Sequence, residues 1–117
     1  MGSEGTIQLL LVDDYPVVLS GLVSMFKNHE DIEVVGVANN GVKAIQLAKQ
    51  LSQKVVLMNL NMPEMDGIEA TREIRKANPA IQVLIFSGIN TSDRVMPALN
   101  AGAIGFILKD ATEPEIL

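Results

Sequence analysis

The chain has 117 residues, a formal net charge of −5 and no cysteine. That length allows one domain with one core, and a 48% share of hydrophobic residues against 20% charged residues excludes a disordered tail. Without cysteine the chain forms no disulfide and no thiolate metal site, which is compatible with the cytoplasm. The acidic balance argues against direct binding of this segment to a nucleic-acid backbone, which needs clustered Lys and Arg.

Nothing in the sequence predicts a membrane span or a secretory signal. No apolar run approaches the roughly 20 residues that cross a bilayer. The opening residues, 1–5, lack the basic and apolar regions of a signal peptide. We therefore expect a cytoplasmic protein that does not contact a membrane.

Five short apolar segments recur along the chain at intervals of about 25 residues. The segments are Ile7–Val12, Ile32–Ala38, Val55–Met58, Ile81–Phe86 and Ile104–Leu108. They are mostly continuous and do not alternate with polar residues, which is typical of strands that are covered on both faces. The stretches between them have helical periodicity, so the sequence predicts an α/β fold with a parallel sheet and right-handed crossovers.

Two of the stretches between the apolar segments predict amphipathic helices. In the first, the apolar positions at helical spacing are Val42, Ile45, Ala48 and Leu51. In the second, they are Ile68, Thr71, Ile74 and Ala77. Asp66 with Glu69 predicts a capping box at the start of the second helix, and Asn78-Pro79 ends that helix.

Proline makes the fourth expected helix, Thr91–Ala101, unusual. Pro97 falls inside it and removes a backbone donor, at a cost of about 3 kcal/mol in a helix interior. We therefore expect this helix to be short, kinked or mobile. A last helix opens at residues 112–115, but the sequence stops at Leu117. Because a doubly wound sheet needs cover on both faces, we expect this final helix to be truncated and the natural protein to continue.

Polar residues of suggestive types close four of the predicted strands. Asp13 and Asp14 follow the first strand, Asn59 the third, Ser87 the fourth and Lys109 the fifth. In open parallel sheets, ligands bind outside the carboxyl ends of the strands. Adjacent carboxylates repel unless a cation lies between them, and oxygen ligands suit Mg²⁺. A lysine and a hydroxyl could hold a phosphoryl group, so the set suits phosphoryl transfer to side chain 59.

Each of these residues alone has an ordinary structural interpretation. Asp13-Asp14 could cap the first helix, and Asn59 could be a buried amide that satisfies the backbone of a loop. Ser87 could belong to an ordinary strand-to-helix turn, and Lys109 could be a solvated strand end. Phe106 could be a core side chain, and His29 a lone histidine without a role. The combination favours the functional interpretation, because suitable residue types occur at the ends of four strands.

Three segments together resemble the receiver domains of two-component response regulators. They are Leu9–Asp14, Asn61–Gly67 and Gly105–Asp110. The shorter pieces that resemble the NarL/LuxR-type subfamily are Asp13–Pro16, Ala101–Ala103 and Leu108–Asp110. The resemblance implies a flavodoxin-like doubly wound sheet of five parallel strands in the order 2-1-3-4-5. It also implies that residues 1–117 form the receiver domain, with a DNA-binding output domain absent from this chain.

In that family, a sensor histidine kinase or a small phosphodonor phosphorylates an aspartate in the presence of Mg²⁺. By resemblance, Asp14 binds the metal directly, Asp13 binds it through water, and Asn61 offers its backbone carbonyl. Asn59 stands at the phosphoacceptor position, where it offers Mg²⁺ one neutral oxygen in place of a charged one.

The phosphoryl group has its own partners by the same resemblance. Lys109 and Ser87 would contact it, and Phe106 would be the switch aromatic that follows Ser87. Lys109 is followed by Asp110, so the cis Lys-Pro bond of many receivers is absent from this chain.

Asn59 departs from the family pattern, because a neutral amide lacks the anionic oxygen that attacks phosphorus. We therefore expect no stable phosphorylation at this position and weakened binding of Mg²⁺. Two origins remain open: an introduced block of phosphorylation, or a natural receiver that signals without phosphate. Lys54, where an acidic residue often stands in the family, indicates wider divergence.

The leading functional hypothesis is therefore a receiver domain of a transcriptional regulator, a binding module and not an enzyme. Its partners would be a sensor histidine kinase and DNA through the absent output domain, with homodimerisation as one output. The alternative is a phosphate-independent pseudo-receiver that acts as a constitutive protein-interaction module. A flavodoxin-like redox protein is a third hypothesis, disfavoured by scarce aromatics and the absence of a phosphate-binding loop after the first strand.

Overall fold

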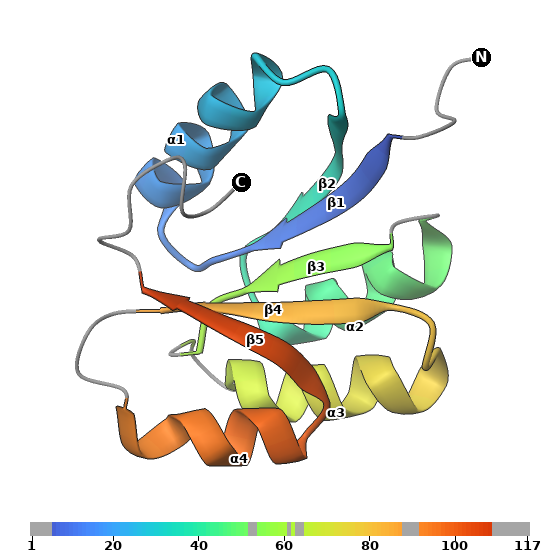
Figure 1. Ribbon diagram of the computed structural model, residues 1–117, viewed down its shortest axis with the longest axis vertical. Coiled ribbons are helices and arrows are strands. Elements are labelled where there is room, and N and C mark those ends of the chain that lie inside the picture. Colours follow the sequence, from blue (N-terminus) through green and yellow to red (C-terminus); the bar gives the residue numbers. More distant parts are fainter. Residues whose placement is uncertain (1–5, 52–53, 61, 63–64, 88–91, 109–117) are drawn as a thin grey trace.

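The computed structural model describes residues 6–51, 54–60, 62, 65–87 and 92–108, without the side chains of residues 87, 92, 95, 106 and 108. Five strands form one sheet in the order β2-β1-β3-β4-β5 (Figure 1). The strands are β1 (Ile7–Val12), β2 (Ile32–Ala38), β3 (Val55–Met58), β4 (Gln82–Ser87) and β5 (Ala103–Leu108). All four neighbouring pairs are parallel, which confirms the expected doubly wound order.

Helices connect the strands on both faces of the sheet. They are α1 (Pro16–Lys27), α2 (Gly41–Gln50), α3 (Gly67–Ala77) and α4 (Val95–Asn100), the last preceded by a 3₁₀ turn at Ser92–Arg94. Side chains begin two of the helices: Asn40 Oδ1 accepts from Lys43 N at 2.7 Å, and Asp66 Oδ1 accepts from Glu69 N at 2.9 Å. The second bond confirms the predicted start of α3. Within the described residues, no helix is both long enough and apolar enough to cross a bilayer.

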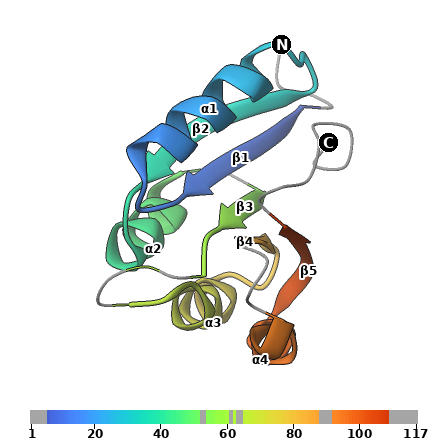
Figure 2. The ribbon, with the colours of Figure 1, turned by 90° about the vertical axis from the view of Figure 1, so that its left-hand side faces the viewer.

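Alternate residues of each buried strand point into two separate cores. In β1, Leu9 and Leu11 join the cluster with α1, which includes Leu22 and Phe26. Leu10 and Val12 face the other way, into the cluster formed with α2, α3 and α4. Figure 2 shows α1 on one side of the sheet and α2 and α3 on the other. Burial on both faces explains why the strands are continuously apolar.

The predicted apolar stripe of α2 is partly wrong. Val42 is 44% exposed, whereas the buried residues of α2 are Gly41, Ala44 and Ala48. Ile45 and Leu51 are partly buried against the core, as expected. Ala48 was predicted in the stripe and is buried, whereas the buried Gly41 and Ala44 were not predicted. The contact face is therefore centred on small residues, which allow the helix to lie close to the sheet.

The fourth helix is shorter than the range Thr91–Ala101 that the sequence suggested, and its shortness agrees with one of the expected outcomes. It begins at Val95, so Pro97 lies in its first turn and not in its interior. Backbone N–H groups of a first turn have no partner within the helix, so the missing donor removes no internal hydrogen bond. Because the helix starts at Val95, it can contain Pro97 without losing an internal hydrogen bond.

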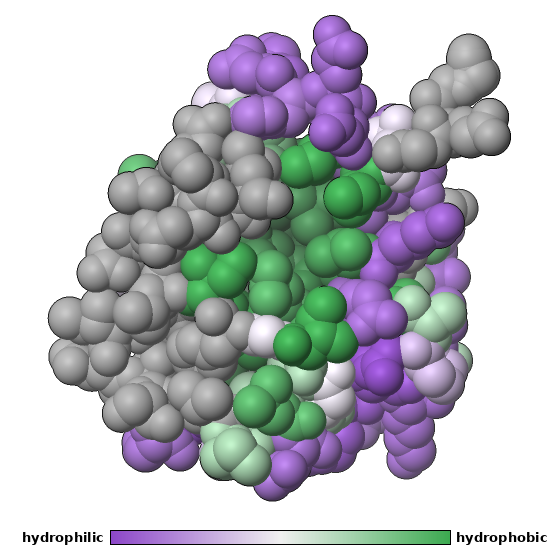
Figure 3. Space-filling model, in the orientation of Figure 1, coloured by the Kyte–Doolittle hydropathy of each residue, from purple (hydrophilic) through white to green (hydrophobic). Residues whose placement is uncertain are grey.

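One part of the α1 face of the sheet carries half-buried apolar side chains. Helix α1 packs on β1 and β2, while Val55, Leu84 and Ile107 of the other strands are only partly buried. Figure 3 shows hydrophobic side chains gathered over the middle of this face. The final helix that the sequence led us to expect falls on residues that lie outside the described part of the chain.

Candidate functional site

The end of β1 delivers a buried carboxylate to the carboxyl edge of the sheet. Asp13 is 1% exposed, and its backbone N donates to Ala38 O at 3.1 Å, which continues the β1–β2 ladder by one residue. Its Oδ1 accepts a hydrogen bond from Tyr15 N at 2.9 Å. Tyr15 is the N-cap residue of α1 and makes no side-chain cap bond. Asp13 therefore orders the turn that leads into α1 and does not act as the cap residue of that helix.

The end of β3 brings Asn59 to the same edge. Asn59 is 3% exposed, and its backbone N donates to Val12 O at 3.0 Å, next to Asp13. Its side-chain Nδ2 donates to Asp14 Oδ1 at 3.2 Å, across 45 positions of sequence. A carboxylate can only accept, so the nitrogen end of the amide must face Asp14. The structure thus brings Asp13, Asp14 and Asn59 together.

A close backbone contact fixes the loop behind Asn59. Gly67 N donates to Leu60 O at 2.7 Å. A Cβ added to Gly67 would lie 2.9 Å from the Asn59 carbonyl carbon and from Leu60 Cα, and nearer still to the Asn59 oxygen. Only glycine fits there. Buried Thr71 then donates from Oγ1 to Gly67 O at 2.6 Å, so the start of α3 is held against residue 59.

The β4–β5 side of the predicted site is described only in its backbone. Ser87 ends β4 and pairs with Leu108, and Phe106 pairs with Ile85. The side chains of Ser87 and Phe106, and the whole of Asn61 and Lys109, lie outside the described residues. The two strands nevertheless end at the same edge of the sheet as β1 and β3.

Two carboxylates and one amide form the described part of the site. Asp13 and Asp14 supply oxygen atoms of the kind that Mg²⁺ prefers. Asn59 presents its N–H group to Asp14, and that group cannot bind a cation. Among the residues that the structure describes, no cluster contains three or more His, Cys, Asp or Glu side chains. The donor set therefore fits a hard cation in type, with one fewer anionic oxygen than three carboxylates would give.

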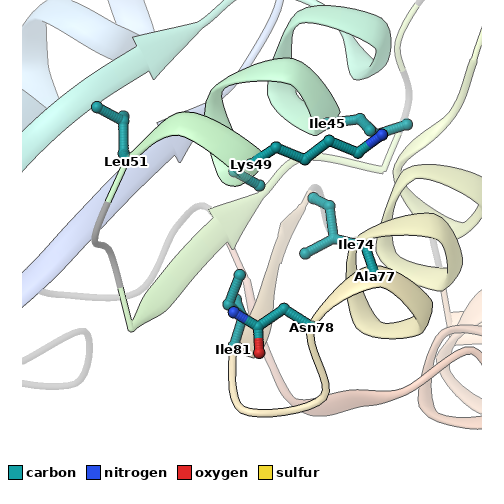
Figure 4. Close-up of a pocket in the computed structure, with 8 residues that line it drawn as sticks. Ile45, Lys49, Leu51, Ile74, Ala77, Asn78 and Ile81 are labelled. Atoms are coloured by element: carbon teal, nitrogen blue, oxygen red, sulfur yellow. The ribbon is translucent and has the colours of Figure 1, made fainter.

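A cavity of about 260 Å³ lies elsewhere, between α2 and α3 (Figure 4). Its lining residues are Ile45, Ala48, Lys49, Leu51, Ile74, Ala77, Asn78 and Ile81. Leu51 ends α2, Asn78 ends α3 and Ile81 precedes β4, so the cavity lies at the amino ends of the strands. Asn59 follows the carboxyl end of β3. The cavity is therefore not part of the candidate site.

Comparisons with known proteins agree with this geometry. The family model of the response regulator receiver domain matches residues 9–117. The chain belongs to the response regulator receiver family. It is 38% identical to the nitrate/nitrite response regulator protein NarL of Escherichia coli (strain K12) over 117 residues, which cover 100% of this chain and 54% of NarL.

Solved structures give the same result. A two-component response regulator of the LuxR family from Aurantimonas sp. SI85-9A1 is 33% identical, with a TM-score of 0.89, over 95% of this chain and 79% of that chain. The signal receiver domain of the NarL regulator from Mycobacterium tuberculosis is also 33% identical, with a TM-score of 0.89, over 95% of this chain and 90% of that chain. The relatives are of NarL/LuxR type, as the sequence motifs indicated. The chain spans about half the length of the curated relatives that it matches.

Sequence reasoning missed one residue of this region. Arg94 Nη2 lies 2.6 Å from Asp66 Oδ2, so the residue before α4 forms an ion pair with the residue that caps α3. No periodicity or motif signals a pair that is 28 residues apart. The Asp66-Gly67 sequence indicated a turn before α3, but it did not indicate how closely Gly67 approaches Asn59.

Proposed function

We propose that this chain is the receiver domain of a NarL/LuxR-type transcriptional response regulator in which the amide of Asn59 blocks phosphorylation. One observation carries the proposal: Asn59 Nδ2 donates to Asp14 Oδ1 at 3.2 Å, in the part-buried site where the family would have an acidic nucleophile. The fold, the family and the acidic pocket support a receiver. The residue at position 59 sets this chain apart.

The block follows from the chemistry of the amide. Phosphoryl transfer to a side chain needs a nucleophilic atom with an available electron pair, which an aspartate would supply here as a carboxylate oxygen. The amide nitrogen of Asn59 directs its N–H toward Asp14, and its lone pair is delocalised into the carbonyl. Asn59 therefore offers phosphorus no competent nucleophile, while it hydrogen-bonds to the acidic pocket in the resting chain.

Asp13 and Asp14 would hold Mg²⁺ if the pocket takes it. The ion, when bound, supplies positive charge that offsets the charge on phosphoryl oxygens. With Asn59 the pocket lacks one anionic oxygen, and the Asn59 N–H group competes for Asp14. Both effects weaken binding of the cation.

We assign partners from the family and its relatives. A sensor histidine kinase would deliver the phosphoryl group to an acidic residue at position 59. Homodimerisation would be one output of the receiver. Regulation of transcription would follow through an output domain that binds DNA, for which the relatives, about twice as long as this chain, leave room. As the resemblance implies, the phosphoryl group would be contacted by Lys109 and Ser87. Phe106 would be the switch aromatic that follows Ser87.

A phosphate-independent pseudo-receiver is the second candidate. The Asn59–Asp14 hydrogen bond favours it, because the bond links two loops of the site without any ligand. In this case the site stabilises one fixed conformation that binds a protein partner constitutively.

The substitution Asn59→Asp separates the two candidates. Amide resonances of the chain and of the variant are compared with and without beryllofluoride and Mg²⁺. A blocked receiver shows no change in the parent chain and extensive changes in Asn59→Asp, whereas a pseudo-receiver shows no change in either. Asn59→Asp combined with Asp14→Asn is the matched control, since it restores the acid at position 59 but removes a cation ligand and must lose the response.

A further inference from the structure

Asp66 uses its two carboxylate oxygens for two different helices. Oδ1 accepts from Glu69 N at 2.9 Å and caps α3. Oδ2 accepts from Arg94 Nη2 at 2.6 Å, and Arg94 is the last residue before α4. The Arg94 side chain is 26% exposed and that of Asp66 is 42% exposed. One side chain thus joins the starts of two helices.

The residue after Asp66 is in contact with position 59. Gly67 N donates to Leu60 O at 2.7 Å, and the Gly67 Cα packs on the Asn59 carbonyl group. Thr71 holds Gly67 from inside α3 through a 2.6 Å hydrogen bond to its carbonyl oxygen. A displacement of the backbone at residue 59 must therefore displace Gly67 and, with it, Asp66.

Helix α4 is short and starts without a side-chain cap. It has six residues, and its N-cap residue, Arg94, makes no side-chain cap bond. Ala98 is buried, whereas Met96 is 62% and Leu99 is 37% exposed. Ile104 of β5, a strand that α4 contacts, is 57% exposed. The placement of the exposed side chains of α4 depends on what holds this helix.

We propose that Asp66 and Arg94 are positioning residues that couple the backbone at position 59 to the start of α4. The connection runs from Asn59 to Gly67, to Asp66, to Arg94 and to α4, and every step is a contact of the described residues. The coupling rests on the proposed function in one respect: binding of a phosphoryl group or its analogue at the site would be the event that moves residue 59. The ion pair itself holds α4 in the resting chain.

Hydrogen exchange tests the resting part of the coupling in the chain as it is. Asp66→Asn keeps an acceptor for the α3 cap but removes the charge that binds Arg94, and Arg94→Gln removes the other partner. Each variant is expected to speed exchange of the amides of residues 98–101, which lie beyond the first turn of α4, by about two- to fivefold, the range for a partly exposed ion pair. Exchange in the first turn of α3 should stay unchanged in Asp66→Asn.

Asp93→Asn is the matched control, because it removes one negative charge from the neighbouring position, which is exposed. It should leave exchange in α4 within twofold of the parent. The double variant Asp66→Asn, Arg94→Gln should exchange no faster than Arg94→Gln alone, since the ion pair is already lost in that single variant. Parent-like exchange of α4 in both single variants, or additive effects in the double variant, would overturn the inference.

The coupling to the site is tested in the Asn59→Asp background with beryllofluoride and Mg²⁺. Asp66→Asn is expected to reduce the shift of α4 resonances by half or more, while resonances near Asp13 respond fully. If Asn59→Asp itself does not respond, the proposed function fails. The hydrogen-exchange experiment then still shows whether the Asp66–Arg94 ion pair holds α4. If Asn59→Asp responds and Asp66→Asn leaves α4 shifts unaltered, the coupling is wrong and the proposed function stands.

Discussion

Helices α3 and α4 lie side by side on one face of the sheet but are held in different ways (Figures 1 and 2). Helix α3 has eleven residues, a side-chain cap from Asp66 and three fully buried side chains, Ala70, Thr71 and Ile74. Helix α4 has six residues and no side-chain cap. The longer helix with the side-chain cap is therefore the one whose first residue lies against Asn59.

Both ends of α4 are tied to charged side chains from the α3 side. At its start, Arg94 binds Asp66. At its end, Gly102 has a φ of 117° and lies against Arg75, whose Nη1 donates to Ile81 O at 2.7 Å and to Pro79 O. Helix α4 thus has a charged side chain near each end and buries Ala98 between them, whereas α3 buries Ala70, Thr71 and Ile74 along its face.

The largest effect is expected for Gly67→Ala, at the start of the well-held helix. The new Cβ would collide with the carbonyl group of Asn59 and with Leu60 Cα. We expect the free energy of unfolding to fall by roughly 2–3 kcal/mol, although alanine is the better helix former by about 1 kcal/mol. Denaturant unfolding measures the change.

Gly21→Ala in α1 is the control for that substitution, because nothing lies within 4 Å of the added Cβ. It should raise the free energy of unfolding by up to about 1 kcal/mol. Equal effects of Gly67→Ala and Gly21→Ala would mean that the loop behind residue 59 adapts easily, and the contrast between α3 and α4 would lose its basis.

An intermediate effect is expected for Gly102→Ala, at the end of α4. A φ of 117° is unfavourable for an L side chain, and the new Cβ would lie 2.9 Å from Arg75 Cγ. We expect a loss of about 1–2 kcal/mol in the free energy of unfolding. Repeating the substitution in an Arg75→Ala background separates the two causes by a double-mutant cycle. A loss that vanishes in that background assigns the effect to the side chain, and a persisting loss assigns it to the backbone.

The smallest effect is expected for Pro97→Ala. Because Pro97 lies in the first turn of α4, its replacement restores no internal hydrogen bond. The free energy of unfolding should change by less than about 1 kcal/mol, mainly through the unfolded chain. A gain near 3 kcal/mol would place Pro97 in a helix interior and contradict the observed start of α4. Leu99→Pro, by contrast, should disrupt the helix.

The sequence predicted the features that depend on local pattern. Continuous apolar runs marked the strands, and the Asp66–Glu69 spacing marked the start of α3, which Asp66 caps. The motifs at the strand ends identified the family, which the receiver-domain match confirms. They also drew attention to Asp13, Asp14 and Asn59, which the sheet brings to one edge.

Other features depend on how distant segments pack, and the sequence did not predict them. The close approach of Gly67 to Asn59 and the Asp66–Arg94 ion pair both join segments whose spacing follows from the sheet and not from the local sequence. Val42 was assigned to the buried face of α2 because apolar spacing cannot show that Ala44 and Gly41 make the contact. The start of α4 was misplaced because a separate 3₁₀ turn, Ser92–Arg94, precedes the helix.

The backbone of residue 59 is anchored on both sides of its Cα. Its N–H bonds to Val12, and its carbonyl group is wedged against Gly67. Replacing the amide nitrogen of Asn59 by an oxygen would therefore leave the backbone anchors in place, but it would remove the hydrogen bond to Asp14 and put a third carboxylate beside Asp13 and Asp14. We therefore expect the amide and acid forms to differ in charge and hydrogen bonding at this one side chain and not in the path of the main chain.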